Sequence, residues 1–362
     1  TSLVNIRASL NPYDNDTLSE YTEEEEDEIL QADRLQEKGN IELAQAYYDK
    51  ALELFTQAHE IYKRLHYHPG IVNSYLGMAG THQNRSNYKQ ALLILDEALK
   101  ITEQHDFYLL RASVFGSMGN AYNKLGDLQK SIEYHKKSLG INREFHNQIA
   151  EGNNLGNIGI IYQTLGEYDQ SMYYYKQALQ INQRIGNQQS LAHNLGNIGN
   201  VYHNLGEYNT AIEYHQQAIE INRNLENKLA IGHNLGNLGL IYQILGDNDT
   251  AIEMFQQAIE LSREIGSRQS TAIGLGNLGY SFYLQKKYDQ AIAILQQAVS
   301  ISKELGIQKP EGYFVGYLAE TYAALNQVTL AIEYFEASIQ VCDKSTPPTV
   351  GSFRGSLALL LA

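Results

Sequence analysis

Small and apolar residues recur along this chain at helical spacing, and the whole pattern returns every 40 residues. Within residues 194–221, Leu195, Ile198 and Tyr202 fall on one side of a helix. Two series of small residues run through the chain, the second displaced from the first by seven positions, or two helical turns. The first is Ala91, Ser131, Ser171, Ala211, Ala251, Ala291 and Ala331, and the second is Ala98, Ser138, Ala178, Ala218, Ala258, Ala298 and Ser338. This unbroken interval predicts an array of stacked helical repeats.

A turn residue divides each repeat into two helices. The turn positions are Gly126, Gly166, Gly206 and Gly246, with Ser86, Lys286 and Asn326 in the weaker copies. A tyrosine recurs four residues before the turn, at Tyr122, Tyr162, Tyr202, Tyr242 and Tyr322. We therefore expect seven blocks over residues 70–349, each made of two antiparallel helices, A and B. In the block 190–229 these helices are predicted over about residues 190–204 and 209–224.

The first repeat departs from this spacing. We place its turn at Gly39 and Asn40, and its small residues include Ala51 and Ala58. Because Ala58 lies 40 residues before Ala98, helix B of this repeat is predicted to be seven residues longer, which leaves its buried face unchanged. Such a helix would cap the array.

The repeat resembles the tetratricopeptide repeat. The residues that carry the resemblance in the copy 190–229 are Leu195, Ile198, Gly199, Tyr202, Gly206, Tyr208, Ala211 and Ala218. The period is longer than the usual one of about 34 residues, and the closing proline is missing. Similar long repeats occur in the Pins/LGN adaptors, the kinesin light chains and bacterial signalling proteins. The resemblance implies an all-α, right-handed superhelical solenoid of about eight antiparallel helix pairs.

Three segments are expected along the chain. Residues 1–27 form an N-terminal segment with an acidic block, Glu23 to Glu28, that is either a docking tail or a solvated helix start whose acids suit the helix dipole. Residues 28–349 form the array. Residues 350–362 begin a further or capping helix after Pro347 and Pro348. The sequence at both ends leads us to expect that the chain is part of a longer protein.

Composition excludes several classes of function. The net charge of −14 and a pI near 5.2 argue against nucleic-acid binding, which requires a basic stripe. A single cysteine, Cys342, excludes an internal disulfide framework and fits a cytoplasmic location. No apolar run is long enough to cross a membrane. No catalytic constellation, cofactor motif or metal-ligand set is present, since His193, His203 and His233 lack a carboxylate or thiol to complete one. We do not expect an enzyme.

The side of helix A opposite its apolar face is polar and nearly uncharged, and by resemblance it lines the concave groove. The candidate binding residues on it are Asn120, Asn153, Asn157, His193, Asn197, Asn200, His233, Asn237 and Asn277. Asparagine offers a donor and an acceptor that match a peptide backbone, although the same residues could bond one helix to the next. A glycine recurs on this side at Gly116, Gly156, Gly196, Gly236, Gly276 and Gly316, either because neighbouring helices approach closely or because a ligand does.

The last repeats change the polar side to an aromatic one. Tyr280, Tyr283, Tyr313 and Tyr317 would anchor apolar side chains of a partner, or would stack against a following repeat. Self-association through the apolar C-terminal end is also open.

These features favour a protein-binding scaffold that captures an extended or helical polypeptide segment in its groove. Asn157, Asn197, Asn237 and Asn277 would hold the backbone of that segment. The alternative is a regulatory or sensor arm of a larger enzyme, such as a caspase-like protease or a signalling ATPase, because similar arrays are attached to both.

Overall fold

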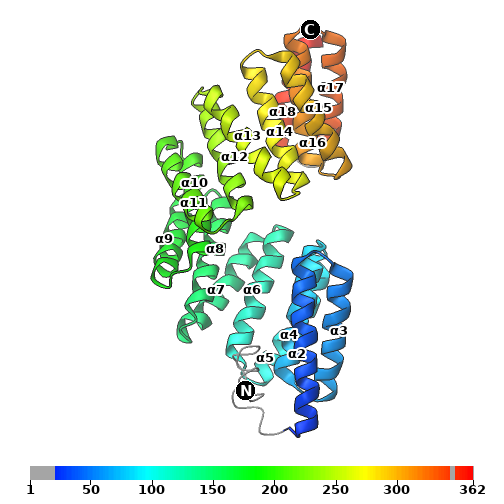
Figure 1. Ribbon diagram of the computed structural model, residues 1–362, viewed down its shortest axis with the longest axis vertical. Helices are drawn as coiled ribbons and strands as arrows, with labels where there is room; N and C mark the ends of the chain where they lie inside the picture. Colours follow the sequence, from blue (N-terminus) through cyan, green and yellow to red (C-terminus); the bar gives the residue numbers. More distant parts are fainter. Residues whose placement is uncertain (1–20, 343–346, 362) are drawn as a thin grey trace. The chain divides into compact units, whose positions relative to one another are not determined.

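The computed structural model describes residues 21–342 and 347–361 (Figure 1), so the first twenty residues of the predicted N-terminal segment lie outside the described residues. This part of the chain contains seventeen helices and no strand. Consecutive helices form antiparallel A–B pairs, eight of them in the described residues, from α2 and α3 to α16 and α17, followed by α18. The predicted all-α solenoid of about eight helix pairs is confirmed.

Contacts divide the chain into two compact units, residues 1–187 and 188–362. The helices of unit 1 are α2 (Glu23–Ala44), α3 (Tyr48–Arg64), α4 (His68–Asn84), α5 (Tyr88–Gln104), α6 (Tyr108–Leu125), α7 (Leu128–Glu144), α8 (Gln148–Thr164) and α9 (Tyr168–Arg184). Those of unit 2 are α10 (Gln188–Asn204), α11 (Tyr208–Asn224), α12 (Lys228–Ile244), α13 (Asn248–Glu264), α14 (Arg268–Leu284), α15 (Tyr288–Glu304), α16 (Gln308–Ala324), α17 (Val328–Cys342) and α18 (Pro347–Leu361).

The turn positions predicted for the seven blocks of residues 70–349 are correct, because every one of them has a left-handed backbone. Gly126 and Gly206 have φ of 82° and 79°. Ser86, Lys286 and Asn326 adopt φ near 60° at the same place, which strains a residue with a side chain. Both series of small residues are buried along the whole array, which lets the paired helices approach closely.

The prediction for the first repeat is wrong. Its turn lies at Ala46, where φ is 62°, and not at Gly39, which is buried inside α2. A Cβ atom on Gly39 would lie 2.6 Å from the ring of Phe55, so this glycine admits an aromatic ring instead of turning the chain. The additional length therefore belongs to the first helix, α2, of 22 residues, while α3 has the usual 17. Helix α2 begins with a capping box between Thr22 and Glu25.

In six of the eight pairs, one large side chain from helix B fits against a glycine of the preceding helix A. A Cβ atom on Gly159 would lie 2.7 Å from Tyr175, and one on Gly239 would lie 2.5 Å from Phe255. The recurring tyrosine before the turn stacks on helix B of its own repeat, as Tyr202 does on Tyr214 at 5.4 Å between ring centroids. The core is thus a series of separate contacts between adjacent helices, as expected for a repeat array.

Two of these large side chains are buried histidines. His135 Nδ1 donates to Asn154 Oδ1 at 3.3 Å, and His215 Nδ1 donates to Asn234 Oδ1 at 2.8 Å. The Nε2 atom of each ring is buried without a hydrogen-bond partner, so a protonated ring would place an uncompensated charge in the core. Burial accordingly lowers the pKa of His135 to about 4 and also lowers the pKa of His215.

These histidines should make the protein less stable in mild acid. Between pH 6.5 and about 4 the unfolded chain binds a proton on the His135 imidazole while the folded chain does not, so the free energy of unfolding falls as pH decreases. The lowered pKa of His215 acts in the same direction. His135 alone would contribute on the order of 3 kcal/mol at most. Urea unfolding at several pH values measures how the free energy of unfolding depends on pH. This dependence should be shallower in His135→Leu, which lacks the imidazole. Leucine should fit there, because Leu95 and Leu295 occupy the equivalent position in other repeats. An equal pH dependence in parent and variant would contradict this assignment.

Candidate functional site

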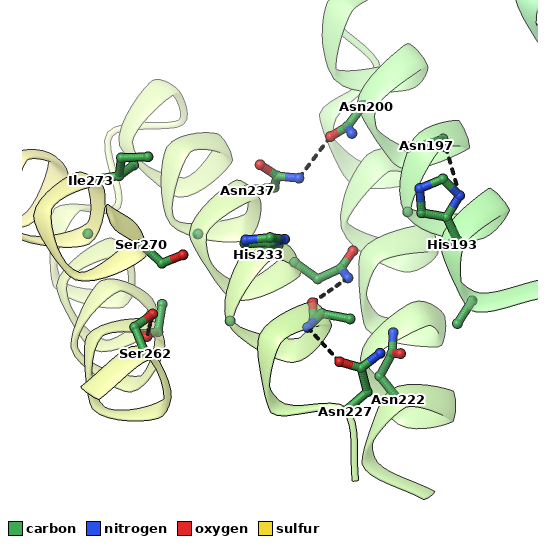
Figure 2. A pocket seen from close by; sticks show the side chains of 18 of the residues that line it. His193, Asn197, Asn200, Asn222, Asn227, His233, Asn237, Ser262, Ser270 and Ile273 are labelled. Carbon is green, nitrogen blue, oxygen red and sulfur yellow. Dashed lines mark hydrogen bonds between the residues drawn. The ribbon is translucent and has the colours of Figure 1, made fainter. Parts of the chain in front are cut away.

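A cavity of about 610 Å³ opens among the helices of unit 2 (Figure 2). Helices α10, α12 and α14 form its walls, and α11 and α13 contribute Asn222, Phe255 and Ser262. The predicted site residues that line it are His193, Asn197, Asn200, His233, Asn237 and Asn277. The structure therefore brings six of the predicted residues together in one pocket.

The pocket exists because two positions of the repeat carry smaller residues here than in the preceding copies. Asn154, Asn194 and Asn234 are spaced by 40 residues, but the next member of this series is Gly274. Likewise, Asn142, Asn182 and Asn222 are followed by Ser262. Both series lie between adjacent repeats, so two missing amide side chains leave space at the same place.

Equivalent glycines show the difference in packing. In unit 1, a Cβ atom on Gly152 would lie 3.0 Å from Asn182 Oδ1. At the equivalent Gly232 the nearest atom is Ala258 O at 3.7 Å, and around Gly236 no atom lies within 4 Å of the Cβ position. The backbone of α12 is thus bare where it faces the pocket.

The residue 19 positions earlier bonds the amide in two members of this series. Asn234 is held by His215 Nδ1, 19 residues earlier, and by its own donation to Ala230 O at 2.8 Å. His135 and Asn154 have the same separation and the same hydrogen bond. Phe255 occupies the corresponding position before Gly274 and has no donor to offer, so an amide at 274 would be buried without that hydrogen bond.

Some of the predicted asparagines bond to one another across adjacent A helices. Asn237 Nδ2 donates to Asn200 Oδ1 at 2.9 Å, as Figure 2 shows, and Asn157 Nδ2 donates to Asn120 Oδ1 at 3.5 Å. Within each pair the two asparagines are 37 residues apart in the sequence. The structural interpretation thus holds for these pairs, yet each amide keeps a second N–H and further acceptor capacity.

The remaining predicted asparagines differ in their surroundings. Asn197 Nδ2 lies 3.4 Å from His193 Nδ1, and the backbone carbonyl of Asn277 accepts from Gln243 Nε2 at 3.1 Å. Asn120, Asn153 and Asn157 belong to unit 1 and are not part of the pocket lining, so their role in binding stays a prediction.

The recurring glycines of helix A serve two purposes. A Cβ atom would meet Asn234 Oδ1 at 2.9 Å on Gly196, the ring of Phe314 at 1.9 Å on Gly276 and the ring of Phe353 at 2.2 Å on Gly316. At these three positions the close approach of the next helix explains the glycine. Gly236 has no such neighbour and lines the pocket.

The pocket is lined by several polar side chains but carries no formal charge. Among the described residues that line it there is no Asp, Glu, Lys or Arg. Desolvation by the surrounding helices lowers the pKa of His193 and of His233, so both imidazoles are neutral at pH 7. Such a surface suits an uncharged ligand that both donates and accepts hydrogen bonds, as a peptide backbone does.

The four predicted tyrosines lie on α14 and α16, next to the pocket. Tyr280 stacks on Tyr317 with ring centroids 4.3 Å apart and on Tyr283 at 5.7 Å. Tyr280 and Tyr317 are 37 residues apart, so this stack replaces the asparagine pair of the earlier repeats. Tyr317 also contacts Phe353 of α18 edge-on, and Tyr313 is half-buried one turn before it.

Sequence reasoning missed the pocket residues that belong to the face between repeats, namely Asn222, Asn234, Ser262 and Gly274. The available signal was the loss of an amide at two positions of an otherwise regular 40-residue series.

The described residues contain neither a metal-binding cluster nor a membrane-spanning helix. Over residues 21–342 and 347–361, no group of three His, Cys, Asp or Glu side chains lies close enough together to bind a metal ion. Nor does any described helix combine the length and apolar character that crossing a bilayer requires.

Comparison with known proteins identifies relatives of the repeat. Heat shock protein STI1 of Saccharomyces cerevisiae is 32% identical over 121 residues, which is 33% of this chain and 19% of that protein. The chain thus matches about a fifth of that relative's length.

Among solved structures, the apo form of the quorum sensor NprR from B. thuringiensis aligns with a TM-score of 0.69 and 16% identity, over 94% of this chain and 95% of that chain. The signal transduction ATPase with numerous domains (STAND protein) with a tetratricopeptide repeat sensor from Pyrococcus horikoshii aligns with a TM-score of 0.61 and 14% identity, over 85% of this chain and 49% of that chain. At these identities the two structures share the fold with this chain.

The family model for the tetratricopeptide repeat matches most of the chain, at residues 30–104, 110–184, 151–224, 188–264 and 231–304. These matches agree with the helix pairs and with the buried small residues of each repeat. The chain therefore belongs to the tetratricopeptide repeat family.

Proposed function

We propose that this chain is a protein-binding scaffold that captures an extended polypeptide segment in the pocket of unit 2. The observation that carries the proposal is an uncharged cavity of about 610 Å³, lined by amides and imidazoles and bounded by bare backbone at Gly236. A cavity of this size accommodates a few residues of a peptide.

The amides would hold the segment by its backbone. Asn237 donates one N–H to Asn200 and retains a second N–H for a peptide carbonyl. The side-chain amide of Asn277 and the imidazoles of His193 and His233 supply further donors and acceptors on the same walls. Because these groups are neutral, they would bind the backbone without selecting charged side chains, which leaves specificity to neighbouring residues.

A matched pair of variants tests the proposal. Peptides of twelve random residues would be selected by display on the intact chain, and their binding measured by fluorescence anisotropy. We expect Asn237→Ala to weaken binding about five- to thirtyfold, because a buried hydrogen bond to the peptide is worth about 1–2 kcal/mol. Asn157→Ala removes the equivalent inter-helix hydrogen bond in unit 1, outside the pocket, and should leave affinity within about twofold.

Circular dichroism would verify that both variants are folded. Failure to select any peptide, or an equal loss of affinity in both variants, would contradict capture in this pocket.

A second candidate function is a regulatory or sensor arm of a larger enzyme. The similarity to the STAND protein favours it, because that protein carries a tetratricopeptide repeat sensor and the alignment covers only about half of its chain. The full-length reading frame distinguishes the two candidates: an adjoining catalytic or nucleotide-binding domain would support the sensor arm, and a reading frame without one would support a free-standing scaffold.

A further inference from the structure

Three tyrosines and one glutamate form a half-buried cluster on the A helices of unit 2. Tyr280 and Tyr283 come from α14, and Tyr317 and Glu320 from α16; we call them the tyrosine–glutamate cluster. The rings of Tyr280 and Tyr317 stack at 4.3 Å, and those of Tyr280 and Tyr283 at 5.7 Å. Glu320 follows Tyr317 by three residues, which places both on the same side of α16.

The carboxylate of Glu320 lacks a cationic partner. Over residues 21–342 and 347–361, no Lys, Arg or His forms an ion pair with it, and no side chain donates a hydrogen bond to it. Desolvation by burial raises the pKa of Tyr280, Tyr283 and Tyr317, and the nearby charge of Glu320 raises each of them further. Burial raises the pKa of Glu320 itself. A partly buried, unpaired carboxylate is unfavourable unless something compensates its charge.

Tyrosines elsewhere in the chain already hold cations. In unit 1, Lys130 lies 5.0 Å from the ring centroid of Tyr122, and Lys137 lies 4.8 Å from that of Tyr134. In the described part of the chain no Lys or Arg lies over the rings of Tyr280, Tyr283 or Tyr317. The tyrosine–glutamate cluster therefore presents both electron-rich rings and a carboxylate to solvent, with neither compensated from within.

We propose that the tyrosine–glutamate cluster binds the guanidinium group of an arginine side chain on the captured polypeptide. A planar guanidinium can lie on the face of a tyrosine ring and at the same time donate two hydrogen bonds to a carboxylate. Partial burial of Glu320 strengthens that charge interaction relative to water. The net charge of −14 also favours a basic partner.

The position of the cluster links it to the pocket, so this inference rests on the proposed function. Asn277 lines the pocket, and Tyr280 follows it by one helical turn on α14. A segment whose backbone is held by the amides can thus direct a side chain onto the cluster. The neutral pocket would bind the chain, and the cluster would select for arginine at one position of it.

The test uses Nα-acetyl-argininamide as the probe and Nα-acetyl-citrullinamide as its neutral isostere. Each would be titrated into the intact chain with ¹³C-labelled tyrosine rings and followed by NMR. We expect saturable shifts of the Tyr280, Tyr283 and Tyr317 signals with argininamide, and affinity at least tenfold weaker with citrullinamide. Glu320→Gln should abolish this difference, whereas Glu333→Gln, at an exposed position on α17, should preserve it. Absence of saturable shifts, or equal binding of both probes, would overturn the proposal.

Stability provides a second readout for the same variant. Removing an unpaired carboxylate should raise the melting temperature of Glu320→Gln above that of the parent at pH 7 but not at pH 4, where the raised pKa leaves Glu320 largely protonated. The titratable side chains beside Glu320 are Tyr280, Tyr283 and Tyr317, whose raised pKa values keep them neutral at pH 7, and α18 contributes the exposed Arg354 from its described side chains. A lower melting temperature at pH 7 would mean that the folded chain already compensates this charge.

Peptide selection separates this inference from the proposed function. Selected peptides without arginine enrichment, together with absent argininamide binding, would overturn the arginine site and leave peptide capture standing. Saturable argininamide binding without any selected peptide would support the arginine site and contradict peptide capture.

Discussion

Refilling the pocket should abolish binding of the selected peptides while leaving the fold intact. The variant combines Phe255→His, Ser262→Asn and Gly274→Asn, which copies the residues present one repeat earlier at His215, Asn222 and Asn234. The two introduced amides would occupy the space that Ser262 and Gly274 leave open, and the introduced imidazole would donate to the amide at 274. We expect affinity to fall at least tenfold, since the backbone of the peptide would lose its place on the wall of α12.

The neighbouring repeats indicate that these substitutions fit. Asn222 donates to Ala218 O at 2.7 Å, and Ser262 already donates to the corresponding carbonyl of Ala258 at the same distance. Gly232 would face the amide at 262 as Gly152 faces Asn182. The change at 274 requires Ile259 to adjust, because its Cγ1 lies 2.7 Å from the Cβ position, but Ile219 is accommodated beside Asn234 in the repeat before.

Ser302→Asn is the matched control for this variant. It makes the same change 40 residues later, at a buried position that does not line the pocket. Its affinity should equal that of the parent. Anisotropy titrations would be accompanied by thermal melts, and Ser262→Asn alone would be used if the triple variant melts early. Unchanged binding by a folded triple variant would place the bound segment elsewhere.

The repeat register was sufficient to predict the helix pairs because it depends on local properties. A left-handed residue between two helices and small residues along each face recur at a fixed interval, so Ser86 and Lys286 could be assigned as turns without a glycine. The same reasoning failed at Gly39, since a glycine that turns the chain and a glycine that admits the ring of Phe55 look alike in sequence.

The candidate site was only partly predictable, for a related reason. The polar side of helix A correctly included Asn237 and His233, whose exposure follows from helical geometry alone. The depth of the pocket depends instead on packing between repeats. The glycine at 274 indicates an open space only once Phe255, on the preceding helix, is known to lie beside that position. Such pairs, 19 residues apart, cannot be assigned from helical periodicity within one element.

Two glycines one repeat apart should respond to alanine in opposite directions. At Gly276 the new methyl would lie 1.9 Å from the ring of Phe314, which is buried and cannot move freely, so we expect destabilisation of about 1–3 kcal/mol. At Gly236 no atom lies within 4 Å, and alanine should stabilise the helix by roughly 0.5–1 kcal/mol. Urea midpoints of the two variants measure this difference, and a loss of stability in Gly236→Ala would show that the position is packed.

Gly236→Ala should also weaken peptide binding although it strengthens the fold. The methyl group would project from the bare stretch of α12 into the space between Asn237 and Gly274, where the proposal places the backbone of the bound segment. Gly276→Ala cannot separate an effect on binding from an effect on stability, because any loss of affinity in that variant would follow from disturbed packing. A stabilised Gly236→Ala variant with full affinity would show that the segment does not approach this backbone. A stabilised variant with reduced affinity would mean that Gly236 makes room for the ligand. This glycine lowers the stability of the helix, and no protein atom packs against its Cβ position.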